Sequence, residues 1–188
     1  MTGLEQALVR LARILSEHGI PYMIIGGMAN VIWGEPRSTL DIDATVWVED
    51  ERIGQIVSLL AGRFRTIPED PQRFIRETRV LPLETEAGLR IDLVFGLLQY
   101  EREAIDRAVE ITVAGSKIRF CTPEDLILHK IISERLRDLE DARKVVRRRF
   151  DSLDLTYLEP RIHELARALE RPEILEIWER WKEEAAKG

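Results

Sequence analysis

Three aspartates in this chain have the type and spacing of a site for a divalent cation. Asp41 and Asp43 are separated by one residue, so on a β-strand both side chains lie on the same face. Asp92 follows between two apolar residues, where a neighbouring strand would bring a third carboxylate to the pair. Aspartate is a poor strand former, so two in one strand indicate a use beyond structure. A cation held by these carboxylates would suit a substrate that carries negative charge.

Two adjacent glycines precede these acids. Gly26 and Gly27 lie where an apolar stretch over residues 22–25 ends and a short helix over residues 28–33 is expected to begin. Glycine lets the backbone approach a ligand closely, and a helix N-terminus offers free N–H groups, so the position suits phosphate. A glycine pair alone is more often an ordinary turn. Its place shortly before Arg37, Thr39 and the paired acids favours the phosphate interpretation.

Taken in this order, the residues resemble the signature of the DNA polymerase beta-like nucleotidyltransferase superfamily. Within that superfamily they look like the AbiEii-like nucleotidyltransferases of abortive-infection and toxin–antitoxin systems. The resemblance extends through the apolar-Asp-apolar triplet at 91–93 to a later element in which a lysine precedes aspartates, Asp138 and Asp141. It implies that Asp41, Asp43 and Asp92 are metal ligands and catalytic residues, together with Lys130 as a catalytic residue. The nucleotide-binding residues that it implies are Gly26, Gly27, Arg37, Thr39, Lys130 and Asp138.

The activity implied by the resemblance is transfer of a nucleoside monophosphate from a nucleoside triphosphate, such as ATP, to an acceptor hydroxyl. Two Mg²⁺ ions, or Mn²⁺ in their place, would activate the hydroxyl and hold the leaving charge. Thr39 fits a supporting role in the glycine loop better than a role as a reactant. The acceptor stays open among an RNA 3′ end, a protein and a small molecule such as an antibiotic, because no residue selects one. A toxin with a cognate antitoxin or other partner protein is a further implication.

Other interpretations stay open beside this one. A catalytically silent module of the same fold could keep the nucleotide pocket and bind a partner, and a plain scaffold could carry the acids as surface residues. Lys130 could be a phosphate ligand or a lysine whose stem crosses apolar surface. Asp138 is expected early in a helix, where the helix dipole favours acids regardless of function. The basic run over residues 143–149 could contact an RNA backbone or simply suit a helix C-terminus.

Composition limits the classes to which the protein can belong. With 188 residues the chain can form one globular domain with a core or one domain plus a helical appendage. Its single cysteine, Cys121, excludes an internal disulfide, and no apolar run is long enough to span a bilayer. The formal charge of −6 gives no general attraction to nucleic acid. Residues 1–16 show the spacing of an amphipathic helix and not of a signal peptide, so we expect a cytoplasmic protein.

Hydrophobic periodicity predicts an α+β protein of the nucleotidyltransferase fold, in which helices flank a mixed β-sheet. The strand with the paired acids should cover a core with its other face, formed by Leu40, Ile42, Ala44, Val46 and Val48. Helices are expected over residues 4–18 and 51–64, and strands over residues 79–85, 89–95, 109–113 and 117–120. From Thr122, a good N-cap, the pattern is helical. We therefore predict a nucleotidyltransferase α/β core over residues 1–121 and a helical region over residues 122–188 that packs on it.

Overall fold

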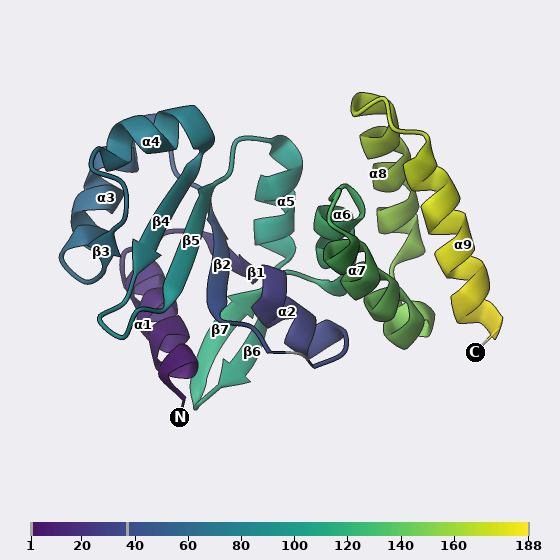
Figure 1. Cartoon of the computed structure of the whole chain (residues 1–188), viewed down its shortest axis with the longest axis horizontal. Coiled ribbons are helices and arrows are strands. Elements are labelled where there is room, and N and C mark those ends of the chain that lie inside the picture. The colour runs from purple at the N-terminus through teal and green to yellow at the C-terminus, as the bar shows by residue number, and fades with distance from the viewer. Residues whose placement is uncertain (1, 37, 188) are drawn as a thin grey trace. The chain divides into compact units, whose positions relative to one another are not determined.

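The computed structural model describes residues 2–36 and 38–187, and the helices and strands are labelled in Figure 1. Arg37, one of the expected nucleotide-binding residues, lies outside the described residues. The chain divides into two compact units. The sheet unit contains the described residues of 1–28 and 38–121, and the helical unit contains those of 29–37 and 122–188.

The sheet unit is built on a mixed sheet, which has seven strands in the described part of the chain, in the order β3-β4-β5-β2-β1-β7-β6. Their bounds are β1 Tyr22–Ile25, β2 Asp41–Val46, β3 Arg65–Thr66, β4 Val80–Glu84, β5 Arg90–Phe95, β6 Val109–Val113 and β7 Ser116–Phe120. Central strand β2 pairs antiparallel with β1 and parallel with β5. The sheet with its accompanying helices confirms the expected fold class.

Apolar side chains on the central strands form the core of this unit. All four residues of β1 are buried, and the alternating positions Ile42, Ala44 and Val46 of β2 are fully buried. Burying a side chain of the size of isoleucine contributes about 1.5–3 kcal/mol to folding. Leu40, expected on this face, is instead 75% exposed, because β2 begins one residue later at Asp41. The periodicity was right, but β2 ends at Val46, so Val48 lies beyond the strand although it is buried.

Helices accompany the strands of the sheet unit, namely α1 Gly3–Glu17, α3 Ile53–Ala61, α4 Pro71–Thr78 and α5 Gln99–Arg107. Thr2 and Glu5 form a capping box at the start of α1, where each side chain binds the other residue's backbone N–H. Helix α2, Gly26–Trp33, begins at the first glycine and not at residue 28. Helices α4 and α5 were not expected from the sequence, since each is short and buries few apolar side chains.

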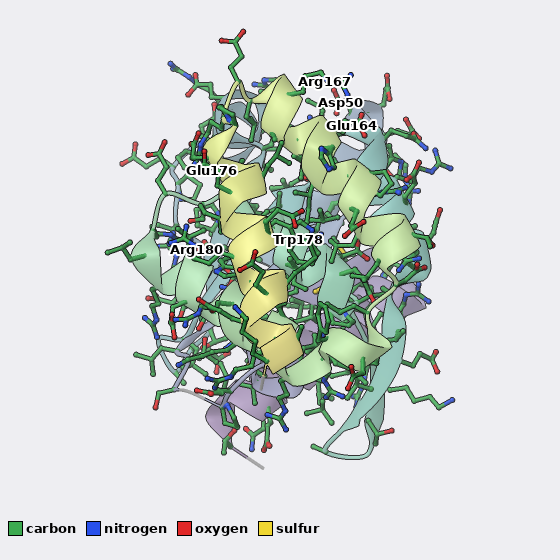
Figure 2. All side chains as sticks on the ribbon, turned by 90° about the vertical axis from the view of Figure 1, so that its right-hand side faces the viewer. Asp50, Glu164, Arg167, Glu176, Trp178 and Arg180 are labelled. Atoms are coloured by element: carbon green, nitrogen blue, oxygen red, sulfur yellow. The ribbon has the colours of Figure 1, made fainter. Side chains whose placement is uncertain are left out.

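The described part of the helical unit contains four further α-helices and the end of α2. They are α6 Pro123–Ile131, α7 Leu136–Arg149, α8 Leu155–Ala168 and α9 Glu173–Lys187. The Thr122 side chain accepts a hydrogen bond from the Asp125 N–H, as expected of an N-cap. Figure 2 shows α9 beside α8, with the buried Trp178 on α9. Across the described residues, no helix combines the length and apolar character that crossing a membrane requires.

Candidate functional site

The pairing of β2 with β5 brings the three expected metal ligands together. In this parallel pair Asp43 lies opposite Asp92, and Asp41 lies opposite Arg90. Register partners, and residues two apart on one strand, share a face of the sheet. All three carboxylates and the Arg90 guanidinium therefore belong to one face, on which Asp41 is exposed and the other two aspartates are half-buried.

Gly26 brings the backbone against this cluster more closely than any other residue type allows. Its φ is +62°, in the left-handed region that glycine enters without strain. A Cβ atom at this position would lie 2.0 Å from Oδ2 of Asp43, well inside van der Waals contact. The neighbouring β1–β2 pair, Ile25 with Asp43, fixes this approach. Glycine is thus required here by both conformation and space.

Gly27 makes a second close approach, to Thr39. An added Cβ would lie 2.3 Å from the Thr39 hydroxyl oxygen, which itself donates a hydrogen bond of 3.3 Å to the Asp41 carbonyl. Thr39 therefore packs Gly27, in the first turn of α2, against the start of β2. Because α2 begins at Gly26, the first backbone N–H groups of that helix have no partner within the helix. Such groups can bind phosphate oxygens.

Arg90 was expected on the strand face of Asp92, but no role in the cluster was assigned to it from the sequence. Its Nε donates to both carboxylate oxygens of Asp92 at 3.0 Å, and the side chains are 57% and 24% exposed. The signal was present in the sequence, because an arginine two residues before the expected ligand must share its face of the strand. Among the described residues, the structure therefore places the positive charge of Arg90 on the sheet face of the three carboxylates.

The chemistry of these residues suits a divalent cation, although their present arrangement is not a formed ligand shell. Carboxylate oxygens are the ligands that Mg²⁺ and Mn²⁺ prefer, and three of them converge on one sheet face beside Gly26. No group of three or more His, Cys, Asp or Glu side chains within residues 2–36 and 38–187 has the geometry to hold a metal ion. Asp92 is bound to Arg90, so a cation would have to replace that guanidinium.

Lys130 lies in the helical unit between two aspartates of α7. Its Nζ lies 2.6 Å from Oδ1 of Asp138 and 3.0 Å from Oδ2 of Asp141, and only 6% of its side chain is exposed. The ammonium is thus buried and paired, which differs from a lysine that carries its charge out to solvent. Two of its three N–H donors serve these carboxylates. The Lys-then-Asp element of the sequence is a hydrogen-bonded cluster that joins α6 to α7.

Asp138 is held in its charged form by this cluster. Burial would raise its pKa, but the hydrogen bond and the attraction from Lys130 outweigh burial. Ser133, which donates a 3.0 Å hydrogen bond, and Arg135 act in the same direction, so the pKa lies below the usual value of an aspartate. The lowered pKa links this carboxylate to the stability of the fold.

Asn30 extends the cluster and was also missed from the sequence. It is fully buried on α2, and its side-chain amide donates to the Asp141 carboxylate at 3.4 Å and to the Glu35 carbonyl at 3.2 Å. A buried asparagine in an otherwise apolar helix was the available signal, because a buried amide needs partners. Asn30 ties residues 29–36 to α7 within the helical unit.

The basic run at the end of α7 has intramolecular partners. Arg148 donates to the Gly34 carbonyl at 2.5 Å, and Arg149 donates to the carbonyls of Trp33 and Ile32. These carbonyls belong to the C-terminus of α2, where positive charge is favoured by the helix dipole. The remaining members, Arg143, Lys144 and Arg147, form ion pairs with glutamates. The run therefore contacts the end of α2 and neighbouring glutamates, and its contact with an RNA backbone stays a prediction.

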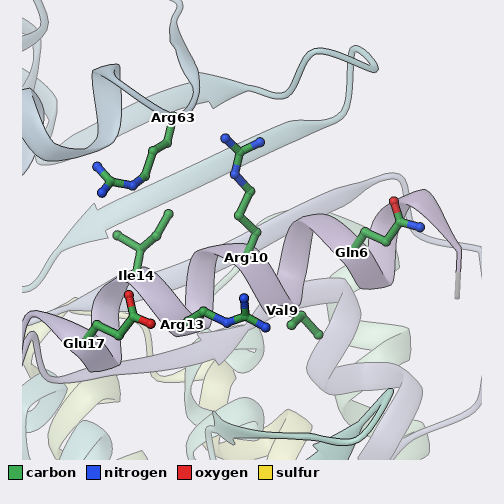
Figure 3. A pocket seen from close by; sticks show the side chains of 7 residues that line it. All are labelled: Gln6, Val9, Arg10, Arg13, Ile14, Glu17 and Arg63. Carbon is green, nitrogen blue, oxygen red and sulfur yellow. The ribbon is translucent and has the colours of Figure 1, made fainter.

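The sheet unit also has a surface hollow of about 490 Å³, which is lined by residues outside the carboxylate cluster (Figure 3). Arg10 and Ile14 project from α1 on the side that faces Arg63, which follows α3, and all three residues line the hollow. The rest of its lining is Gln6, Val9, Arg13 and Glu17. None of the expected metal ligands lines this hollow, so the carboxylate cluster is a separate feature of the sheet unit.

The family model described as "Nucleotidyltransferase of unknown function (DUF6036)" matches residues 4–185. The chain belongs to this nucleotidyltransferase family. A search of curated proteins finds no match. The family match does not distinguish an AbiEii-like subgroup, which stays a prediction.

Solved structures with the same fold are nucleotidyltransferases or resemble them. ANT(2")-Ia in complex with adenylyl-2"-tobramycin has 18% sequence identity and a TM-score of 0.59, covering 89% of this chain and 99% of that chain. An antigenic nucleotidyltransferase-like protein from Paracoccidioides brasiliensis has 18% identity and a TM-score of 0.55, covering 93% and 91%. The lincosamide antibiotic adenylyltransferase LnuA, lincomycin-bound, has 15% identity and a TM-score of 0.53, covering 77% and 96%. At these identities the likeness shows a shared fold.

Proposed function

We propose that this nucleotidyltransferase family member transfers a nucleoside monophosphate from a nucleoside triphosphate to an acceptor hydroxyl in a reaction that depends on Mg²⁺ or Mn²⁺. The observation that carries the proposal is the pairing of Asp43 with Asp92 beside Gly26. The Asp43 and Asp92 carboxylates lie side by side on paired strands, so their charges repel each other. Gly26, which no other residue type can replace, borders Asp43. Both features have a use if a cation and a triphosphate bind there.

The residues of the sheet unit would divide the work between charge and position. Asp41, Asp43 and Asp92 would hold two divalent ions, which supply an activated hydroxyl and neutralise the leaving pyrophosphate. Gly26, Gly27 and the first N–H groups of α2 would bind the triphosphate oxygens. Thr39 would keep the glycine loop against β2. Asp92 would also accept the proton of the acceptor hydroxyl.

The remaining expected residues are proposed to act on the nucleotide. Lys130 would neutralise phosphate charge with the N–H that its two aspartates leave over, and Asp138 would hold Lys130 in that orientation. Arg37 is proposed as a second phosphate ligand on the strength of its place in the motif. These assignments predict that removing the charged side chain of Lys130 or of Arg37 lowers nucleotide use and leaves metal binding intact.

An AbiEii-like role, as the toxin of a toxin–antitoxin pair, is the finer form of the proposal. It predicts an RNA or protein acceptor and an antitoxin that suppresses the activity. Two of the similar structures contain lincomycin and adenylyl-2"-tobramycin, so antibiotic hydroxyls belong in the same screen. The sheet face of the acids is polar and partly exposed, which is compatible with each of these acceptors.

The test is transfer of label from each α-³²P nucleoside triphosphate, with Mg²⁺, to total RNA, to cell protein or to aminoglycosides and lincosamides. We expect labelled product and pyrophosphate with the parent, and a loss of at least roughly 100-fold with Asp43→Asn, since an amide cannot supply the negative charge that two cations need. Glu86→Gln, an exposed acid in the β4–β5 turn, is the control and should keep full activity.

The outcomes separate the candidate classes. Magnesium-dependent nucleotide binding without pyrophosphate release would identify a catalytically silent module. Full activity in chelator, or activity that survives in Asp43→Asn, would contradict the metal assignment. If the protein neither binds nor transfers from any triphosphate, the scaffold interpretation is the one that holds.

A further inference from the structure

Arg90 binds the carboxylate of Asp92, which the proposed function assigns to a metal ion. Its Nε contacts both oxygens of Asp92 at 3.0 Å, so the guanidinium covers the edge of the carboxylate that a cation would use. The register of β2 with β5 also sets Arg90 beside Asp41. The side chain thus shares a sheet face with the acids of the cluster and is bound to one of them, Asp92.

We propose that Arg90 is a built-in counter-ion of the metal site, which a divalent cation must displace from Asp92. Without metal, the Arg90 guanidinium lowers the repulsion among the three carboxylates. With metal, two positive groups compete for the same oxygens, so the cation and Arg90 exclude each other. The inference rests on the proposed function, because it presupposes that Asp92 is a metal ligand.

The exposure of the pair supports exchange over permanent pairing. Arg90 is 57% exposed, so its guanidinium can move into solvent without losing buried contacts. The buried lysine of the helical unit differs, since Lys130 lies between two carboxylates with 6% of its side chain exposed. The ion pairs of Lys130 are therefore buried, whereas the Arg90–Asp92 pair lies at the surface of the strand.

The test compares Arg90→Gln with Arg65→Gln. Arg65 on β3 pairs with Glu84 on β4 in the same sheet, is 65% exposed, and has no expected ligand as its partner. Binding of Mn²⁺ is followed by the electron paramagnetic resonance of the free ion, with Mn²⁺ alone and with the α,β-methylene analogue of each nucleoside triphosphate. Thermal melts in chelator and in Mn²⁺ give a second readout that needs no turnover.

We expect Arg90→Gln to bind Mn²⁺ roughly 3- to 10-fold more tightly than the parent, because the competing cation is gone. It should melt lower than the parent in chelator and gain more from Mn²⁺. Arg65→Gln should bind Mn²⁺ as the parent does, whatever its melting temperature.

Two failures are distinguishable. Equal or weaker Mn²⁺ binding by Arg90→Gln, with clear binding by the parent, would overturn the inference and leave the metal site in place. Weaker binding in particular would mean that Arg90 positions Asp92 for the cation. No Mn²⁺ binding by parent or variant, alone or with any nucleotide analogue, would overturn the proposed function and the inference with it.

Discussion

At the scale of single residues, the strictest requirement is at Gly26. Its positive φ alone would cost an alanine about 1–2 kcal/mol. The methyl group would in addition meet Asp43 at a distance of 2.0 Å, so either the carboxylate or the loop must move. Gly88 separates the two effects, because its φ is +76° and a Cβ there would meet nothing within 4 Å.

We therefore predict that Gly26→Ala lowers transfer activity by roughly 100-fold, since a small displacement of a reacting group is enough for such a loss. Gly88→Ala should destabilise the protein by about 1–2 kcal/mol and leave turnover per folded molecule unchanged. Urea unfolding and initial rates measure the two quantities. Equal activity of Gly26→Ala and Gly88→Ala would mean that the close approach to Asp43 has no part in the reaction.

At the scale of helices and strands, a buried ion-pair cluster and a capped helix end join the elements of the helical unit. Lys130 joins α6 to α7 through two aspartates, and Arg148 and Arg149 join α7 to the end of α2. Removing one member of a buried pair is strongly destabilising, because it leaves the other charge uncompensated.

Lys130→Met is accordingly expected to lower the free energy of unfolding by about 3–5 kcal/mol at neutral pH. Lys182→Met is the matched control. Lys182 bridges Glu159 on α8 and Glu179 on α9 but keeps 22% of its side chain exposed, so its loss should cost at most about 1 kcal/mol. If Lys130 also binds phosphate, only Lys130→Met lowers turnover per folded molecule.

The pH dependence of that difference follows from Asp138. Its pKa is lowered in the folded protein, so its contribution to stability is fully present above the usual aspartate pKa of about 3.9 and is lost as the pH falls through the folded pKa. The gap in stability between parent and Lys130→Met should therefore be widest near neutral pH and narrow as the pH falls below about 4. A gap that is constant from pH 7 to pH 3 would contradict this role of the cluster.

At the scale of the whole molecule, ligand binding stabilises the folded chain by mass action. Magnesium with the correct triphosphate at 100 times its dissociation constant adds about 2.7 kcal/mol, or roughly 5–10 °C in melting temperature for a chain of this size. We predict this gain for the parent and for Glu86→Gln, and its loss in Asp43→Asn. Thermal melts with each triphosphate, in Mg²⁺ and in chelator, also identify the preferred base. A gain that persists in Asp43→Asn would remove that residue from the site.

The division of the chain into two units gives the motif an unexpected distribution. Residues 29–36, which lie between the two glycines and the paired acids in the sequence, belong to the helical unit. The glycines and the acids themselves belong to the sheet unit. The short motif therefore links both units, although it occupies fewer than twenty residues of the sequence.

Local patterns determined several features of both units in advance. An Asp-x-Asp pair on a strand shares a face whatever surrounds it, because side chains alternate along every strand, and Asp41 and Asp43 follow that rule. The cap at Thr122 and the core positions of β2 also depend on neighbours a few residues away. These features were predictable because their causes lie within one element.

Tertiary structure decided the partners of the charged residues. Lys130 could have been exposed, and the basic run of α7 could have had no partners within the chain, since each pattern suited both outcomes. Their actual partners lie far along the chain, as with Arg149 and the Ile32 carbonyl, or on the next helix, as with Lys130 and Asp141. Arg90 could equally have turned to Asp41 across the strands, but it lies against Asp92. Charge attraction is long-ranged and weakly directional, so sequence spacing fixes which face a charged side chain occupies, and only the packed fold fixes which opposite charge it meets.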